Sequence, residues 1–461
     1  MAQDVTGTPV KAADARDVGF NSWWMVAVLF GLYVFSWLDR LILSMLVGPI
    51  KADLLLSDFQ ISLLLGPAFA VFYAVFGIPL GWAVDRYARR WVVFFGVTLW
   101  AAATVATGFA RSFEALLLAR IAVGIGEAAL LPAAYSLLAD EFPRNKLTLA
   151  TSVFQMAGKV GSAAAFGLGG LAIAYAVTLD GTDWPFLGEA AAWHLVMIMV
   201  GLPGFLLALA VFTFREPPRR EAAGVTAMAA KARAQGGGPL TAFVRANWQL
   251  VSLMLVSFSG LAIVGYTLTS WIPTYIGRAF GWTPLQYGPA LSLMNIIAAV
   301  SLVVNGRVVD YLFGRGMKDA HLRFYSWLLL ITGPAALFMF LTGNAWLFLV
   351  LYCIVQFATV PFMIYVSSIV ALLAPNMVRG RLIAGFLFCF TILGLGAGPA
   401  MVGAITDFVF QDEARIGSSM MIVVVSCFVV AFIAMRAALR YLAPAVLRAE
   451  SAAAGANAQT P

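Results

Sequence analysis

Apolar stretches of about 20 to 28 residues recur along the whole chain, and each is long enough to cross a lipid bilayer as a tilted helix. Of the 461 residues, 62% are hydrophobic and 11% are charged, so too few charges exist to give each element a water-facing side. Segments with the alternating pattern of membrane barrels are absent. The sequence therefore predicts an all-α membrane protein and excludes a soluble one.

Twelve such stretches are predicted to span the membrane, and they fall into two sets of six. The first set comprises Trp23–Val47, Ile61–Val84, Trp91–Phe109, Phe113–Ala139, Leu149–Val177 and Trp193–Phe214. The second comprises Trp248–Ile276, Leu285–Val309, Phe324–Leu341, Trp346–Leu373, Leu382–Thr406 and Ser419–Leu442. This division predicts two pseudo-symmetric six-helix bundles.

The expected domain organisation follows from these spans. It consists of an N-terminal tail (1–20), an N-terminal bundle (21–214), a linker (215–246), a C-terminal bundle (247–442) and a C-terminal tail (443–461). The linker is rich in Pro, Ala, Gly and basic residues and has room for a short surface helix. The first twenty residues lack the apolar core of a signal peptide, so the first span is expected to direct insertion.

Basic residues predict the orientation in the membrane. With the N-terminus in the cytoplasm, Lys51, Arg111, Arg278 and Arg415 are the Lys and Arg residues that fall in outer connections. Because cytoplasmic connections carry the excess of Lys and Arg, both termini and the linker are expected to be cytoplasmic, in a plasma (inner) membrane. This topology explains the net charge of +7 without a nucleic-acid partner.

A short polar pattern repeats between the halves, in the connection that follows the second span of each. The repeated positions are Gly81, Asp85 and Arg90 in the first half and Gly306, Asp310 and Arg315 in the second. Internal repeats around a central site are typical of transporters that work by alternating access. At the cytoplasmic ends of the helices, these acids and bases could hold an inner gate shut, or the bases could merely obey the inside rule.

The stretch from Gly81 through Asp85, Arg86 and Arg89 to Arg90 resembles the signature of the major facilitator superfamily. It departs from the family pattern at Ala88, where Gly is usual. The second copy has Tyr311 where the first has Arg86.

Two further segments, Trp37-Leu-Asp39-Arg40 and Arg120 to Ala128, resemble the Spinster branch of that superfamily. The resemblance implies a monomeric, proton-coupled carrier of an amphipathic substrate such as a lysophospholipid or a sphingoid phosphate. The charge pattern leaves a small carboxylate or a drug-like compound as alternatives.

Five residues that carry a charge lie near the middle of predicted spans, all in the first half: Asp39, Arg40, Arg120, Glu127 and Lys159. An ionised side chain within the bilayer costs at least about 2.5 kcal/mol unless it meets a partner or water, so such residues are usually functional. Asp39 and Arg120 lie at similar depths, and adjacent residues such as Asp39 and Arg40 point about 100° apart, so the two cannot share a partner.

We expect Asp39 and Glu127 to carry the transported proton, because neighbouring charges tune the proton affinity of a carboxylate in an apolar cavity. Arg40, Arg120 and Lys159 would compete for these carboxylates and for an anionic substrate head group. The alternative is a static network of buried ions that only holds the helices together.

Uncharged candidates for the wall of the cavity complete the predicted site. They are Tyr33 and Ser36 in the first half, and Tyr266, Thr269, Ser270, Trp271, Gln356, Thr359 and Tyr365 in the second. They suit an apolar or amphipathic substrate body, although any one of them could instead serve helix packing.

Other functional classes find little support. The two histidines, His194 and His321, lie near predicted helix ends and belong to no nucleophile, base or metal constellation, so neither an enzyme nor a metal or cofactor site is expected. No phosphate-binding loop for ATP is present. A channel or a lipid scramblase is a distant alternative to a carrier.

Overall fold

The computed structural model describes residues 19–180, 182–184, 188–189, 191–219 and 238–457. Within these residues the chain is helical apart from one two-stranded antiparallel ribbon, in which β1 (Asp183–Trp184) pairs with β2 (Gly188–Glu189). The predicted all-α class is therefore confirmed.

The elements of the first half form one group of helices. They are α1 (Phe20–Met45), α2 (Val47–Leu54), α3 (Asp58–Leu65), α4 (Pro67–Arg86), α5 (Arg89–Thr107), α6 (Phe113–Glu127), α7 (Leu130–Glu141), α8 (Arg144–Val177) and α9 (Ala192–Ala210). The ribbon of β1 and β2 lies between α8 and α9.

The elements of the second half form the other group. They begin with α11 (Pro239–Ala246), α12 (Trp248–Phe280), α13 (Pro284–Gly314), α14 (Ala320–Phe338), α15 (Ala345–Thr359) and α16 (Phe362–Leu373). They continue with α17 (Asn376–Phe390), the π-helix η1 (Thr391–Ala397), α18 (Gly398–Ala404), the π-helix η2 (Ile405–Phe410), the 3₁₀-helix η3 (Glu413–Arg415) and α19 (Ile416–Asn457).

Each of the twelve predicted spans coincides with a helix or with consecutive helices. In the described part of the chain, eleven of these are long and apolar enough to cross a membrane, and α14 is the twelfth predicted span. The last helix differs from the prediction, because α19 continues to Asn457 through residues expected to form a tail. Alanine, the strongest helix former, is frequent there and favours this extension.

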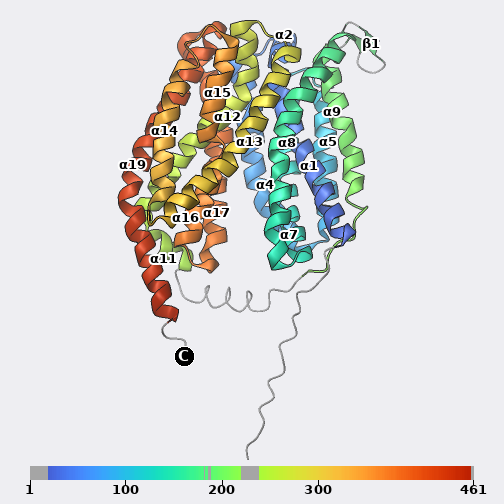
Figure 1. Ribbon diagram of the computed structural model, residues 1–461. Coiled ribbons are helices and arrows are strands. Elements are labelled where there is room, and N and C mark those ends of the chain that lie inside the picture. The colour runs from blue at the N-terminus through green and yellow to red at the C-terminus, as the bar shows by residue number, and fades with distance from the viewer. Residues whose placement is uncertain (1–18, 181, 185–187, 190, 220–237, 458–461) are drawn as a thin grey trace, which may run out of the picture.

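The two groups of helices stand side by side (Figure 1), with blue to green elements on one side and yellow to red elements on the other. Between them α8 packs against α13, α4 against η1, and α3 against α18. One end of the molecule, here called the tail end, contains the start of α1, α11 and the end of α19. The opposite end, here called the far end, contains α2 and the β1–β2 ribbon.

Several spans are interrupted near their middle. The span of α6 and α7 breaks at Ala128 and Ala129, and that of α15 and α16 breaks before Pro361. Pro132 and Pro361 have no N–H to donate to the preceding turn, which explains both breaks. The first break follows Glu127 directly, so this carboxylate lies at the end of a helix inside the bundle.

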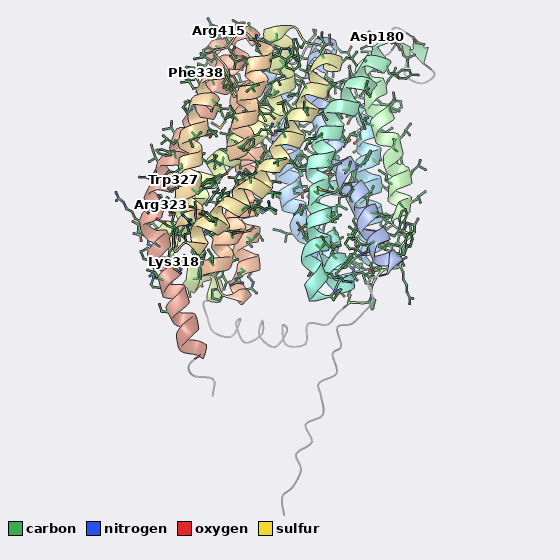
Figure 2. All side chains as sticks on the ribbon, viewed as in Figure 1. Asp180, Lys318, Arg323, Trp327, Phe338 and Arg415 are labelled. Atoms are coloured by element: carbon green, nitrogen blue, oxygen red, sulfur yellow. The ribbon has the colours of Figure 1, made fainter. Side chains whose placement is uncertain are left out.

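Side chains on the outer surface follow the expected lipid boundary (Figure 2). Asp180 and Arg415 lie at the far end, and Lys318 lies toward the tail end. Between these levels, Trp327 and Phe338 project from α14 with exposed apolar rings. Charges at both ends of an apolar belt are the arrangement that a membrane-spanning bundle requires.

Candidate functional site

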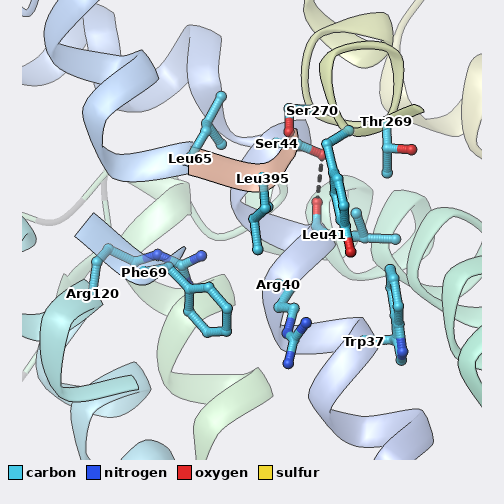
Figure 3. Close-up of a pocket in the computed structure, with 11 residues that line it drawn as sticks. Trp37, Arg40, Leu41, Ser44, Leu65, Phe69, Arg120, Thr269, Ser270 and Leu395 are labelled. Carbon is cyan, nitrogen blue, oxygen red and sulfur yellow. Dashed lines mark hydrogen bonds between the residues drawn. The ribbon is translucent and has the colours of Figure 1, made fainter. Parts of the chain in front are cut away.

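A cavity of about 430 Å³, which includes space open to solvent, lies between the two groups of helices (Figure 3). Its lining residues from the first group are Trp37, Arg40, Leu41, Ser44, Leu65, Phe69 and Arg120. Those from the second group are Tyr266, Thr269, Ser270 and Leu395. Both of its charged lining residues are arginines from the first group, so the wall is cationic on one side and apolar to weakly polar on the other.

Glu127 is the centre of the first charged pair in this site. It is buried, and its Oε2 accepts hydrogen bonds from Arg40 Nε and from Ser36 Oγ, each at 2.6 Å. Arg40 Nη2 lies 2.5 Å from the same oxygen. Ser36 and Arg40 are four residues apart on α1, so both face α6.

Arg40 is also surrounded by aromatic rings. Its guanidinium carbon lies 4.5 Å from the ring centroid of Phe69, 5.1 Å from that of Tyr73 and 5.5 Å from that of Trp37. Cation–π attraction at desolvated sites is worth about 2 kcal/mol. The rings therefore hold Arg40 in place when its ion pair with Glu127 is disturbed.

Asp39 forms the second charged pair, on a different face of α1. Its buried carboxylate accepts a hydrogen bond from Thr104 Oγ1 on α5 at 2.6 Å, and its Oδ2 lies 4.0 Å from Arg120 Nη1. Arg120 Nε donates to the carbonyl of Leu64, 3.3 Å away. Asp39 and Arg40 therefore meet different partners on α6, as their angular separation along the helix requires.

Three polar atoms of these pairs are buried without a hydrogen-bond partner in the described part of the chain: Asp39 Oδ2, Arg120 Nη1 and Glu127 Oε1. A buried polar atom without a partner costs about 1–3 kcal/mol, more when it is charged. The two pairs are therefore incompletely satisfied, and a proton or an incoming anion would find binding capacity here.

The second group lines the cavity with three residues that carry a hydroxyl and one leucine. Thr269 uses its hydroxyl to donate to the carbonyl of Gly265 on its own helix, at 2.8 Å. Tyr266 and Leu395 present mainly apolar surface beside Ser270.

Other predicted cavity residues do not line this cavity. Trp271 is fully buried and donates from its indole N–H to the carbonyl of Pro399, 3.0 Å away. Tyr365 is buried against Tyr325, with ring centroids 4.2 Å apart, and its hydroxyl donates to Asn305 at 2.9 Å. In this structure both side chains are packed within the second group, and their role in a substrate cavity stays a prediction.

The remaining uncharged candidates and Lys159 are likewise not among the residues that line this cavity. Gln356 and Thr359 are buried on α15, and Tyr33 stacks on Phe154 with centroids 5.0 Å apart. Lys159, on α8, is half-buried and forms no ion pair with any carboxylate in the described residues. Among the five predicted intramembrane charges, it is therefore the one that stands outside the paired network.

The signature connection lies at the tail end. Arg89 is buried, forms an ion pair with Asp140, and donates to Ser136 Oγ at 3.0 Å and to the carbonyl of Pro217 at 2.6 Å. Glu216 accepts the backbone N–H of Arg89 at 2.9 Å. These bonds tie Arg89 to its own group of helices rather than across the molecule.

The remaining signature residues are exposed or partly exposed. Asp85 and Arg86 are exposed, Gly81 has open space around it, and Arg90 Nε lies 3.3 Å from Glu216 Oε2. In the second copy, Asp310 and Arg315 are exposed.

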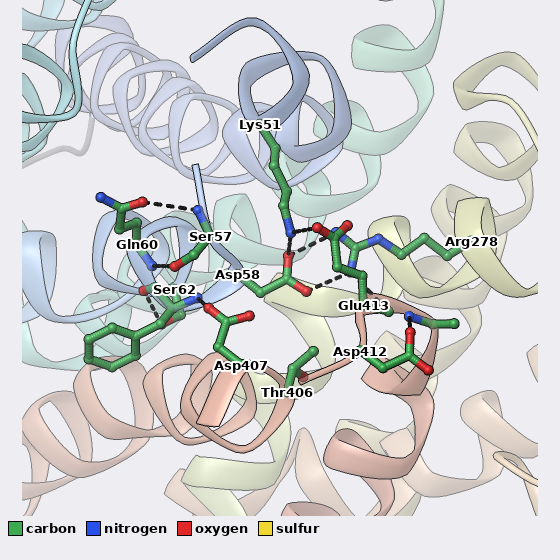
Figure 4. Close-up of polar contacts among 12 residues, drawn as sticks. Lys51, Ser57, Asp58, Gln60, Ser62, Arg278, Thr406, Asp407, Asp412 and Glu413 are labelled. Atoms are coloured by element: carbon green, nitrogen blue, oxygen red, sulfur yellow. Dashed lines mark hydrogen bonds and ion pairs between the residues drawn. The ribbon is translucent and has the colours of Figure 1, made fainter. Parts of the chain in front are cut away.

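A cluster of four charges joins the two groups at the far end (Figure 4). Asp58 is fully buried at the start of α3 and accepts from Lys51 Nζ at 2.6 Å and from Arg278 Nη1 and Nη2 at 2.7 and 2.8 Å. Glu413 Oε1 lies 2.7 Å from Lys51 Nζ. We call Lys51, Asp58, Arg278 and Glu413 the far-end cluster.

Two further contacts reinforce this closure. Asp407 Oδ2 accepts the backbone N–H of Phe59 at 2.6 Å, so an acid of the second group caps the N-terminus of α3. A Cβ on Gly403 would lie 2.6 Å from the carbonyl oxygen of Asp58, which shows how closely α18 approaches α3. Sequence analysis missed this site, since Asp58 follows Ser57 and reads as an ordinary acid in the first turn of a helix.

Comparison with known proteins adds three kinds of similarity. Residues 29–318 match the family described as Major Facilitator Superfamily. An MFS-type efflux pump of Mycolicibacterium smegmatis is 28% identical over 85% of this chain and 86% of its own length. The D-galactonate transporter of Escherichia coli is 26% identical over 67% of this chain and 71% of its own.

Spinster proteins appear both among the sequence relatives and among the similar solved structures. Protein spinster of Drosophila melanogaster is 26% identical over 59% of this chain and 42% of its own length. The crystal structure of a bacterial homolog of the human lysosomal transporter Spinster, in an inward-facing and unoccupied conformation, matches with a TM-score of 0.75. It is 24% identical and covers 94% of this chain and 98% of the other, so it supports the fold.

Proposed function

This chain belongs to the Major Facilitator Superfamily of membrane transporters, and from that premise we propose that it carries an amphipathic organic anion by proton-coupled alternating access. The predicted superfamily is confirmed, as is the predicted similarity to Spinster proteins. The predicted class of transporter rather than enzyme follows from the family.

One observation carries the proposal: two incompletely paired carboxylate–arginine pairs, Asp39 with Arg120 and Arg40 with Glu127, lie at one cavity. Arg120 Nη1 makes no hydrogen bond and lies 4.0 Å from Asp39 Oδ2, so a substrate anion can compete with Asp39 for it. When the anion binds, it weakens the hold of Arg120 on Asp39, and the carboxylate then takes up a proton more readily. Binding of the two ligands is thereby coupled, and the coupling acts in both directions.

The opposite wall favours a substrate with an apolar body. Tyr266 and Leu395 offer apolar surface, and the hydroxyl of Thr269 is already used within its own helix. A lysophospholipid or a sphingoid phosphate combines one anionic head with such a body. We propose this amphipathic class as the substrate.

The far-end cluster also bears on which end of the molecule faces the outside of the cell. We propose that the far end faces outward, so that the protein is closed to the outside in this structure and both termini are cytoplasmic in a plasma membrane. Asp85 and Arg86, exposed at the tail end, are free to meet the other group when that end closes. The domain boundaries of the sequence analysis and a monomeric carrier are part of the same proposal.

Proteoliposomes test this function directly. A pH difference imposed across the proteoliposome membrane should drive saturable accumulation of a labelled lysophospholipid. Asp39→Asn or Glu127→Gln should abolish this driven accumulation, while exchange of substrate across the membrane continues. Thr98→Ala, a buried hydroxyl change on α5, serves as a control for general damage. Accumulation that is unchanged in both carboxylate variants would refute the coupling.

A small sugar acid is the second candidate, because relatives such as the D-galactonate transporter share the match. A polyhydroxylated acid needs many hydrogen-bonding partners, and from the second group the cavity offers the hydroxyls of Tyr266 and Ser270 besides that of Thr269, which already donates within its own helix. Competition between a lysophospholipid and galactonate for the purified protein separates the two. Stronger displacement by galactonate would favour the sugar acid.

A further inference from the structure

We propose that His194 is a proton-responsive positioning residue of the outer gate, which makes opening of the far end depend on external pH. The proposal rests on the outward assignment of the far end and on alternating access. It does not depend on the substrate, nor on the carboxylates in the cavity.

His194, at the start of α9, is fully buried among polar partners from three other segments. Its Nδ1 lies 2.8 Å from the carbonyl oxygen of Gly108, at the end of α5. Its Nε2 lies 3.1 Å from Arg111 Nη1, before α6, and 3.3 Å from Asp53 Oδ2, on α2. Among the described residues, the charged groups that face this ring are Arg111 and Asp53, one of each sign.

These contacts give the imidazole two alternative partners. A carbonyl oxygen can only accept, so Nδ1 carries a proton and donates to Gly108. In the neutral ring Nε2 is then an acceptor, which suits the N–H of Arg111 and opposes the carboxylate of Asp53. In the protonated ring Nε2 becomes a donor, which suits Asp53 and repels Arg111.

A change of partner at His194 bears directly on α2. Asp53 Oδ2 also accepts the indole N–H of Trp193 at 3.0 Å, so α2 is held to the start of α9 at this one carboxylate. Lys51, two residues earlier on α2, reaches both Asp58 and Glu413 in the far-end cluster, as Arg278 does from the second group. Strengthening the bond from His194 to Asp53 therefore fixes the helix that presents Lys51 to the gate.

Water can deliver the proton, because the side chain of Asp53 is 33% exposed beside the buried ring. The carboxylate of Asp53 stabilises the protonated ring, whereas the guanidinium of Arg111 opposes it. The sign follows from the partners: external acid protonates His194, tightens α2 and favours the closed far end. Alkaline conditions outside release Asp53 and favour opening.

The test measures opening without any substrate. Ser44 lines the cavity and is buried, so Ser44→Cys in a background with Cys353, Cys389 and Cys427 changed to Ala reports access from outside. Right-side-out vesicles with the interior held at pH 7.5 are treated with a membrane-impermeant methanethiosulfonate at external pH 5.5 and 7.5. The modification rate at each pH is divided by the rate of a protein that carries the same cysteine and His194→Gln. The ratio removes the pH dependence of the thiol, because ionisation of the cysteine changes both rates equally.

We expect this ratio to fall about threefold from pH 7.5 to 5.5, the effect of one modest ion pair. Asp53→Asn should abolish the pH dependence as well, and it keeps the test valid if His194→Gln does not fold. A ratio that is equal at both pH values would show that His194 is only structural and would overturn the proposal. Loss of proton coupling at Asp39 or Glu127 would leave the ratio unaffected, so the two proposals fail separately.

Discussion

Asp58 and Arg278 belong to different groups of helices and share a two-point ion pair, with Arg278 Nη1 2.7 Å from Oδ2 and Nη2 2.8 Å from Oδ1. Parallel N–H···O bonds of this kind are among the strongest polar contacts in proteins. Because Asp58 is fully buried, the pair must be broken and both groups rehydrated before the far end can open.

The first prediction concerns this pair. Asp58→Asn removes the charge that holds Arg278 and Lys51, so the far end should open more often. Modification of Ser44→Cys from outside should accelerate about tenfold, a change of about 1.4 kcal/mol in the conformational equilibrium. Asp180→Asn, at the far end on the connection after α8 and outside the cluster, is the control. An unchanged rate in Asp58→Asn would mean that the cluster does not limit opening.

The second prediction concerns the close approach of α18 to α3. Gly403→Ala places a Cβ 2.6 Å from both the carbonyl oxygen of Asp58 and Ser62 Oγ, so backbone must shift and closure should weaken. The same labelling assay should show faster modification of the reporter at Ser44. Gly333→Ala on α14, where nothing lies within 4 Å, is the matched control and should change nothing. Equal rates in the two glycine variants would contradict the packing argument.

The third prediction separates the two arginines of the cavity. Arg120→Lys replaces a planar two-point donor by a single ammonium group, so substrate affinity should fall at least about tenfold. Arg40→Lys should act mainly on proton coupling, because Arg40 binds Glu127 through both Nε and Nη2. Exchange and gradient-driven uptake, measured side by side in proteoliposomes, distinguish these effects. Identical losses in both variants would show that the arginines act as one unit.

The fourth prediction concerns stability and pH at the tail end. Burial opposes ionisation of Glu216, but hydrogen bonds from Arg89 and Arg90 outweigh it and hold the pKa of Glu216 below its usual value of 4.5. Since this pKa is lowered in the folded protein, the unfolded chain binds the proton more tightly. The contribution of Glu216 is therefore present above pH 4.5 and is lost as pH falls through the lowered pKa.

Thermal unfolding in detergent checks this sign. The melting temperature of the wild type should exceed that of Glu216→Gln at pH 7, and the difference should shrink as the pH is lowered from 5 to 3. A difference that persists at pH 3 would show that Glu216 acts through packing rather than charge.

Sequence alone determined the number and approximate limits of the spans, because about 20 apolar residues in succession have few alternatives to a membrane helix. It also identified Asp39, Arg40, Arg120 and Glu127 as charged residues inside the membrane, because a charge within an apolar run is easily recognised. The angular separation of Asp39 and Arg40 along α1 was readable from the helical period.

Tertiary structure decided which side chains face the cavity, the lipid or a neighbouring helix. In a membrane, the surface of a neighbouring helix and the lipid acyl chains are both apolar. The hydrophobic pattern therefore does not tell which way the side chains of Trp271 and Tyr365 point from their helices. The same holds for the far-end cluster. Asp58 looks like any polar residue near a helix start until the fold brings Arg278, 220 residues away along the chain, against it.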